Sequence, residues 1–301
     1  MERPNTLTGF MLLGALLLTF AACNNALQKE KVAEKSVELD TIRVAQRSHL
    51  EGDTANPYCD ISVELIYPIS SRGADVVILQ QFFTQIMLGN AFAEMTPQAA
   101  VEAYVKSCID NYTYDAGTFR ESVTDLEEWS ELIPDVGLHD REQGGSGNFY
   151  SYYESLSNRI VYNRHGVLSF QVEQSNSKRG ATSYVSYRNW VMDVSSGKQV
   201  TENELFRAGY DQALQNLIIA SLLEQNNVKS VEELEDLGFY GVQEIVPNRN
   251  FLLTDRGITY TYNKGEYSAY QLDAPEVFIP YSSIRSLLRE NTPAAKLADL
   301  K

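Results

Sequence analysis

The chain has 301 residues, and 25 Lys and Arg against 40 Asp and Glu give it a formal charge of −15 at pH 7. Hydrophobic residues make up 44% of the chain, enough to fill a core, which argues against a disordered protein. A chain this acidic repels a phosphate backbone, and no local cluster of Lys and Arg offsets the charge. We therefore expect no nucleic-acid partner.

The N-terminus carries the features of an export signal. Residues 9–22 are apolar but too few for a membrane-spanning helix, which needs about 20 residues. They lead directly into residues 20–23 (FAAC), which resemble a bacterial lipobox. This resemblance implies lipid on Cys23 and a protein attached to the periplasmic side of a bacterial membrane. We interpret residues 1–22 as a lipoprotein signal peptide and residues 23–35 as a lipidated tether.

Two further cysteines, Cys59 and Cys108, remain once Cys23 carries lipid. An exported protein lies in a compartment that permits disulfides, so one bridge between them, tying a strand to a helix, is one prediction. Two buried thiols are the alternative, because the sequence does not give the distance between the two Cα atoms. The CxxC spacing typical of zinc and redox sites is absent.

In the first half of the chain, some segments alternate apolar and polar residues and others carry apolar residues at helical spacing. Turn signals separate these segments. We expect strands at 37–44 and 59–67, the second ending at Pro68, a helix at 75–95, and a second helix from Thr96-Pro97 to about Tyr112. The acidic residues 124–131 are interpreted as a solvated helix or loop, and the glycine-rich residues 144–148 as a loop.

The sequence of the second half predicts a run of strands, followed by helices and strands in mixed order. Turns are expected at 163–166, 177–180 and 195–198, helices near the capping patterns at 201–204 and 230–233 and over 210–224, a hairpin at 251–262, a strand at 276–280 and a closing helix at 281–289.

Because strands and helices are grouped instead of alternating, the predicted fold class is α+β, with an antiparallel β-meander sheet packed against several helices. We expect an N-terminal α+β subdomain at 36–195, a C-terminal α+β subdomain at 196–291 packed with it, and a tail at 292–301.

Two groups of segments together resemble a known family. The first comprises 166–170 (GVLSF), 190–198 (WVMDVSSGK) and 204–206 (ELF), and the second comprises 251–258 (FLLTDRGI), 260–263 (YTYN) and 277–281 (VFIPY). They are similar to the envelope domain pair of unknown function in RsiV-type anti-sigma factors and PdaC-type peptidoglycan deacetylases. The resemblance covers roughly residues 36–290 and implies the non-catalytic binding or sensing part of such proteins, in a family that recognises lysozyme or accompanies cell-wall chemistry.

Motifs for catalysis are missing from the sequence. His49, His139 and His165 lack metal-ligand spacing, residues 144–147 lack the GxSxG pattern, and no nucleotide-binding glycine motif occurs. We therefore expect no catalytic residue, no metal and no cofactor, in a protein that is not an enzyme. The carboxylates at 125–131 and 232–236 leave a carboxylate-dependent cell-wall hydrolase, or an accessory of cell-wall modification, as the alternative.

Aromatic residues are the more suggestive feature, with 18 Tyr, 12 Phe and 2 Trp. On an exposed sheet face they could stack on sugar rings or anchor a protein partner, whereas packing beneath helices is the alternative. The candidate binding surface comprises Tyr150, Tyr152, Tyr184, Tyr187 and Trp190. We expect a lipid-anchored envelope protein that binds peptidoglycan or a cationic protein such as a lysozyme-like hydrolase. The sequence does not fix the oligomeric state.

Overall fold

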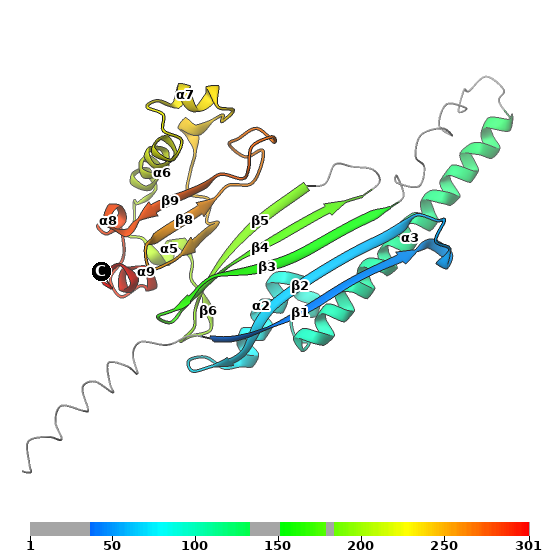
Figure 1. Ribbon diagram of the computed structural model, residues 1–301, viewed down its shortest axis with the longest axis horizontal. Helices are drawn as coiled ribbons and strands as arrows, with labels where there is room; N and C mark the ends of the chain where they lie inside the picture. Colours follow the sequence, from blue (N-terminus) through cyan, green and yellow to red (C-terminus); the bar gives the residue numbers. More distant parts are fainter. Residues whose placement is uncertain (1–36, 133–150, 179–183, 301) are drawn as a thin grey trace, which may run out of the picture.

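The computed structural model describes residues 37–132, 151–178 and 184–300. The described part contains two sheets, one with the order β1-β2-β3-β4-β5-β6 and one with the order β7-β8-β9 (Figure 1). The strands are β1 Val37–His49, β2 Tyr58–Ser71, β3 Tyr152–Arg164, β4 Val167–Ser177, β5 Tyr184–Asp193, β6 Lys198–Gln199, β7 Phe251–Leu253, β8 Gly257–Thr261 and β9 Glu276–Pro280.

The helices lie in groups between runs of strands and after the last strand. The α-helices are α2 Val76–Leu88, α3 Pro97–Leu132, α5 Glu202–Leu205, α6 Asp211–Gln225, α7 Val231–Asp236, α8 Tyr281–Ile284 and α9 Pro293–Ala298, and the short 3-10 helices are η1 Leu50–Gly52, η2 Asn90–Phe92 and η4 Val242–Glu244. The predicted α+β class is confirmed. The large sheet is antiparallel except that β2 and β3 run parallel, and α2 and α3 form the crossover connection that a parallel pair requires.

The first core lies between the large sheet and the helices α2 and α3. Alternate side chains of β2 point to this side, so that Ile61, Val63 and Leu65 are buried while their neighbours are not. They pack in one cluster with Phe83 of α2, whose ring stacks on Phe170 of β4 at a centroid distance of 4.3 Å. This face of the sheet is therefore a packing surface.

β2 continues through Pro68 to Ser71, so the prediction that it ends at Pro68 is wrong. Proline is tolerated here because β3 no longer pairs with β2 at this point. Instead the side chain of Asn158 bonds Ile66, accepting from its N–H at 2.7 Å and donating to its carbonyl at 2.9 Å. The position opposite Pro68 is Leu39, at a register shift of β1.

Three predicted helices differ in length from those of the structure. α2 ends at Leu88 because Gly89 takes a positive φ of 104° and breaks the helix. α3 runs to Leu132 instead of stopping near Tyr112, since residues 113–132 contain no proline that would interrupt the helix. The closing helix stops at Ile284, because the next residues turn back to meet the strand-like segment after α5.

The C-terminal unit packs its small sheet against α6 around a second core. Gly257 in β8 is required by close packing, because a Cβ there would lie 2.2 Å from the carbonyl oxygen of Ile279. Residues 293–298, within the predicted tail, form α9, in which Ala294, Leu297 and Ala298 are buried. The second core also includes Tyr162, Val167, Val191 and Val200 from the large sheet and the segment after it.

Asparagine side chains join the C-terminal unit to the edge of the large sheet. β5 pairs with β6 only at Met192 and Asp193, which leaves the rest of its outer edge without a strand partner among the described residues. Asn250 fills that edge, accepting from the N–H of Asn189 at 2.6 Å and donating to the carbonyl of Tyr187 at 3.0 Å. Asn263 accepts from the N–H of Tyr187 at 2.7 Å. Side chains thus take the place of a further strand.

We expect Asn250→Ala to lower the free energy of unfolding by about 2–3 kcal/mol, because it leaves polar groups of β5 without partners. Urea denaturation followed by circular dichroism measures this. Asn111→Ala is the matched control, since Asn111 is exposed on α3 and should change stability by less than about 0.5 kcal/mol. Equal stability of the two variants would contradict the role given to Asn250.

Candidate functional site

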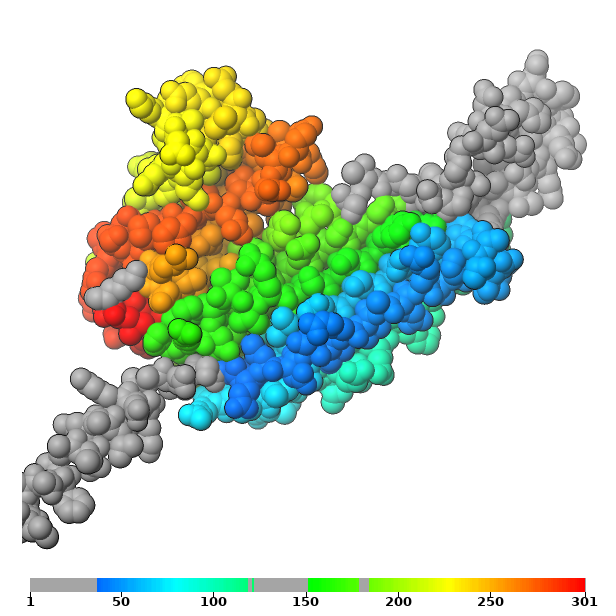
Figure 2. Space-filling model, viewed as in Figure 1, coloured from blue at the N-terminus to red at the C-terminus, as the bar shows by residue number. Residues whose placement is uncertain are grey.

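The face of the large sheet opposite α2 and α3 is polar and lies uncovered along β1, β2 and β3. Figure 2 shows these strands at the front, with the orange C-terminal segments beside β4 and β5. The register brings side chains of this face into rows across the strands, of which one comprises Arg43, Glu64, Ser157, Glu173 and Tyr187. The uncovered face carries both charges and hydroxyl groups.

At the β1 and β2 end of this face, arginines are matched to carboxylates. Arg43 pairs with Glu64 at 2.8 Å, and Arg47 pairs with Asp60. The guanidinium of Arg47 also lies 4.3 Å from the ring centroid of Tyr58, in cation–π geometry. Because each arginine has its own carboxylate, this end of the face has little net charge.

A cleft of about 440 Å³ lies where this face meets the C-terminal unit. Clefts that hold small ligands measure about 300–1,000 Å³. The floor is formed by Arg159, Gln171, Glu173 and Tyr187 of the large sheet, and the wall by Thr261, Asp273, Ala274 and Glu276. The asparagine contacts of β5 hold the floor and the wall together, so the cleft is formed before any ligand binds.

Arg159 is held in the cleft by a chain of hydrogen bonds. Its Nε donates to Gln171 Oε1 at 3.0 Å. Gln171 is only 3% exposed, and its Nε2 donates to Asn189 Oδ1 at 2.9 Å. Asn189 in turn donates to Thr261 Oγ1 at 2.7 Å. A terminal nitrogen of Arg159 also lies 3.5 Å from Glu276 Oε1, which makes an ion pair between the two sheets.

The cleft collects more negative than positive charge. Glu173, Asp273 and Glu276 line it beside the single guanidinium of Arg159, and Asp273 also has Lys264 at 3.6 Å. Burial raises the pKa of the Tyr187 phenol, Glu173 and Asp273 raise it further, and Arg159 opposes them. Glu173, Asp273, Glu276 and Arg159 therefore all act on this one hydroxyl group.

The predicted aromatic surface is divided between the two sides of the sheet. Tyr187 lines the cleft, and Tyr184 is exposed beside Tyr270 at a centroid distance of 6.4 Å. Tyr152 and Trp190 pack on the helix side, against Tyr112 of α3 and Phe82 of α2 respectively. Tyr150 lies outside the described residues. The structure thus does not gather the five residues into one surface.

Sequence reasoning missed Arg159, Asp273 and Glu276 as members of one site. Arg159 is a charged residue on an alternating strand, which usually indicates no more than a solvated position. Two of its acidic neighbours in the cleft, Asp273 and Glu276, lie more than 100 residues away in the chain. No local motif could have joined them.

The two cysteines of the described part are free thiols, Cys59 buried and Cys108 half-buried. Burial raises the pKa of the Cys59 thiol to about 12, and the nearby Cys108 and Glu154 contribute. Burial also raises the pKa of Cys108. Cys59 on β2 and Cys108 on α3 thus lie close to one another. Cys23 falls outside the described residues.

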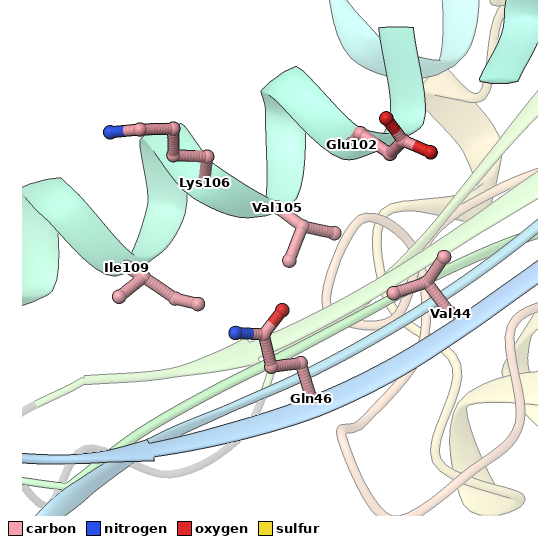
Figure 3. Close-up of a pocket in the computed structure, with 6 residues that line it drawn as sticks. All are labelled: Val44, Gln46, Glu102, Val105, Lys106 and Ile109. Carbon is pink, nitrogen blue, oxygen red and sulfur yellow. The ribbon is translucent and has the colours of Figure 1, made fainter. Parts of the chain in front are cut away.

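A second hollow lies between β1 and α3 (Figure 3). Val105 and Ile109 of α3 point toward Val44 and Gln46 of β1 and enclose about 280 Å³. Its lining is mainly apolar apart from Gln46, and its charged residues Glu102 and Lys106 lie on one helix. Of these two hollows, the other cleft is the one where charged groups from several elements meet, so we take that cleft as the candidate site.

In the part of the chain that the structure describes, no three His, Cys, Asp or Glu side chains are grouped so that they could hold a metal ion. His49 bonds the carbonyl of Asn56 through Nδ1 at 2.9 Å, and His165 lies 2.6 Å from the hydroxyl of Tyr162. No helix within residues 37–132, 151–178 and 184–300 is apolar over the length needed to cross a membrane. His139 lies outside these ranges.

The geometry thus defines an α+β protein with a polar cleft between its two sheets. Residues 203–282 match the model of a family described as a protein of unknown function (DUF3298), so the chain contains a DUF3298 domain there. This segment starts in α5, ends in α8 and includes the whole cleft wall.

Solved structures extend the likeness to most of the chain. The crystal structure of a DUF3298 family member from Bacteroides fragilis is 24% identical, with a TM-score of 0.75, and the match covers 89% of this chain and 99% of that one. A DUF3298 family protein from Pseudomonas aeruginosa is 13% identical, with a TM-score of 0.56, over 86% and 98% of the two chains. At these identities the matches show the fold. None of the curated proteins compared with the chain matches it.

The two thiols should be unreactive in the folded protein, because their raised pKa values leave little thiolate near neutral pH. We expect iodoacetamide at pH 8 to label Cys59 and Cys108 at least about tenfold more slowly in the native full-length chain than in denaturant. Peptide mass spectrometry measures the labelling. Both cysteines should label in denaturant without a reductant, whereas labelling that requires a reductant would show the disulfide between Cys59 and Cys108 instead.

Proposed function

We propose that this chain is a lipid-anchored cell-envelope protein with a non-catalytic binding or sensing domain of the RsiV and PdaC type. Its cleft between the two sheets binds cationic groups, which a lysozyme-like hydrolase or peptidoglycan would present. The observation that carries the proposal is the cleft itself, where Glu173, Asp273 and Glu276 meet one guanidinium.

Electrostatics supports a cationic partner. The segment 202–300 alone contains 15 acidic and 8 basic residues, so the unit that forms the cleft wall is strongly negative. A cleft in which one sign of charge predominates raises the local concentration of groups of the opposite sign and speeds their encounter. Tyr187 supplies aromatic surface next to these carboxylates in the cleft.

The cleft carboxylates should control binding of a basic lysozyme. We expect the double variant Glu173→Gln and Asp273→Asn to weaken lysozyme binding by the full-length chain about tenfold or more, measured by surface plasmon resonance, because two favourable charge contacts are lost. The double variant Glu235→Gln and Asp236→Asn removes the same charge from exposed positions of α7 and should change affinity by less than about twofold.

Salt gives a second measurement of the same contacts. Affinity should fall as salt rises, because ions screen exposed charges. An affinity that is unchanged from low to high salt, or equal in the two double variants, would count against the cleft as the binding site. Turnover of muropeptides by the unaltered chain, lost in Glu173→Gln, would instead favour the alternative function, a carboxylate-dependent cell-wall hydrolase.

Attachment to the membrane should depend on Cys23. We expect Cys23→Ser to abolish incorporation of a radioactive fatty acid and to release the protein from the membrane fraction, because no other residue supplies the acceptor thiol of the lipobox-like segment. Cys108→Ser is the control and should be labelled normally. Persistent label on the Cys23→Ser protein would refute lipidation at this site.

A further inference from the structure

The cleft contains charged groups of both signs. A site for cations alone would need its carboxylates but not the guanidinium of Arg159. Arg159 donates from Nε to Gln171, and one terminal nitrogen lies near Glu276. A guanidinium has five N–H groups, so donors remain available. The side chain of Arg159 is 59% exposed. Its free edge is therefore open to a planar acceptor such as a carboxylate.

Glu173 lies beside this guanidinium and has no ion pair among the described residues. The register pairs Arg159 with Gln171, and Glu173 is two residues further along β4 on the same face. Such diagonal neighbours are roughly 7–8 Å apart. The carboxylate of Glu173, without an ion pair in the described part of the chain, and the guanidinium of Arg159, with unused N–H donors, thus lie next to one another on the cleft floor.

The hydrogen bonds that hold Arg159 indicate that this residue does more than form a surface ion pair with Glu276. A buried amide, Gln171, fixes the Nε, and Asn189 and Thr261 continue the hydrogen bonds into the C-terminal unit. Exposed ion pairs add little to stability and rarely need such support. Buried side chains that orient an exposed charged group are typical of a binding site.

We propose that the cleft binds a zwitterionic amino-acid head group, in which an ammonium and a carboxylate share one carbon. Arg159 takes the carboxylate, and Glu173 takes the ammonium with Glu276 nearby. This inference rests on the proposed function, since it names the ligand of the same cleft. A ligand with only carboxylates is repelled by Glu173, Asp273 and Glu276, and a ligand with only amines leaves Arg159 unused.

Three related compounds test the proposal by isothermal titration calorimetry on the full-length chain. meso-Diaminopimelate has two zwitterionic ends, cadaverine is the same molecule without its carboxylates, and pimelate is the same molecule without its amines. We expect diaminopimelate to bind at least about tenfold more tightly than either of the others, because only it engages both charges of the floor.

Variants then assign the contacts. Arg159→Gln should weaken diaminopimelate binding about tenfold or more and leave cadaverine unchanged, whereas Glu173→Gln should weaken both. Arg43→Gln is the matched control, because Arg43 makes a similar ion pair with Glu64 on the same sheet face, outside the cleft. It should bind all three compounds as the unaltered chain does.

Several outcomes would overturn the proposal. They are cadaverine binding as tightly as diaminopimelate, Arg159→Gln binding diaminopimelate normally, and no binding of any of the three compounds. If lysozyme binding depends on the cleft while diaminopimelate does not bind, the proposed function stands and this inference fails. A tripeptide ending in diaminopimelate shows whether the ligand is a peptide or a free amino acid. The tripeptide binds if the head group is recognised within a peptide, and it does not bind if only the free amino acid fits.

Discussion

The arrangement of the site depends on how asparagine side chains complete the edge of β5. Backbone groups at the edge of a sheet need hydrogen-bond partners, and another strand normally supplies them. Here Asn250 and Asn263 bond Tyr187 and Asn189. These contacts bring a second sheet against the first at a fixed angle without extending it. The floor and the wall of the cleft are therefore held by the same few side chains.

Most secondary structure could be predicted because its signals are local. The capping box of Thr201 and Glu204 and the turn before Gly166 depend on residues close in sequence, and both are present. The errors arose where distant residues decide. β2 continues through Pro68 because β3 no longer pairs with β2 there, and Asn158 bonds the backbone of Ile66 instead. Helix α8 is short because the residues after it turn back to meet the segment after α5.

The site could be predicted far less well than the fold. Alternation shows that Tyr152 and Tyr187 lie on strands, but it does not show which face a distant helix covers. Tyr152 meets α3, whereas Tyr187 faces the C-terminal unit. Arg159 and Glu276 come together only because two sheets pack at β5. A cleft between elements far apart in sequence leaves no spacing for a motif to record.

The parallel pairing of β2 and β3 has a consequence for how this architecture can vary. The large sheet consists of two sets of sequence neighbours, β1-β2 and β3-β4-β5-β6, joined through a single long connection that carries α2 and α3. The entropy lost on closing a loop grows only with the logarithm of its length, about 0.6 kcal/mol for each doubling. Insertions in this connection that spare its packed residues are therefore cheap, and evolution can lengthen it while both the sheet register and the distant cleft stay unchanged.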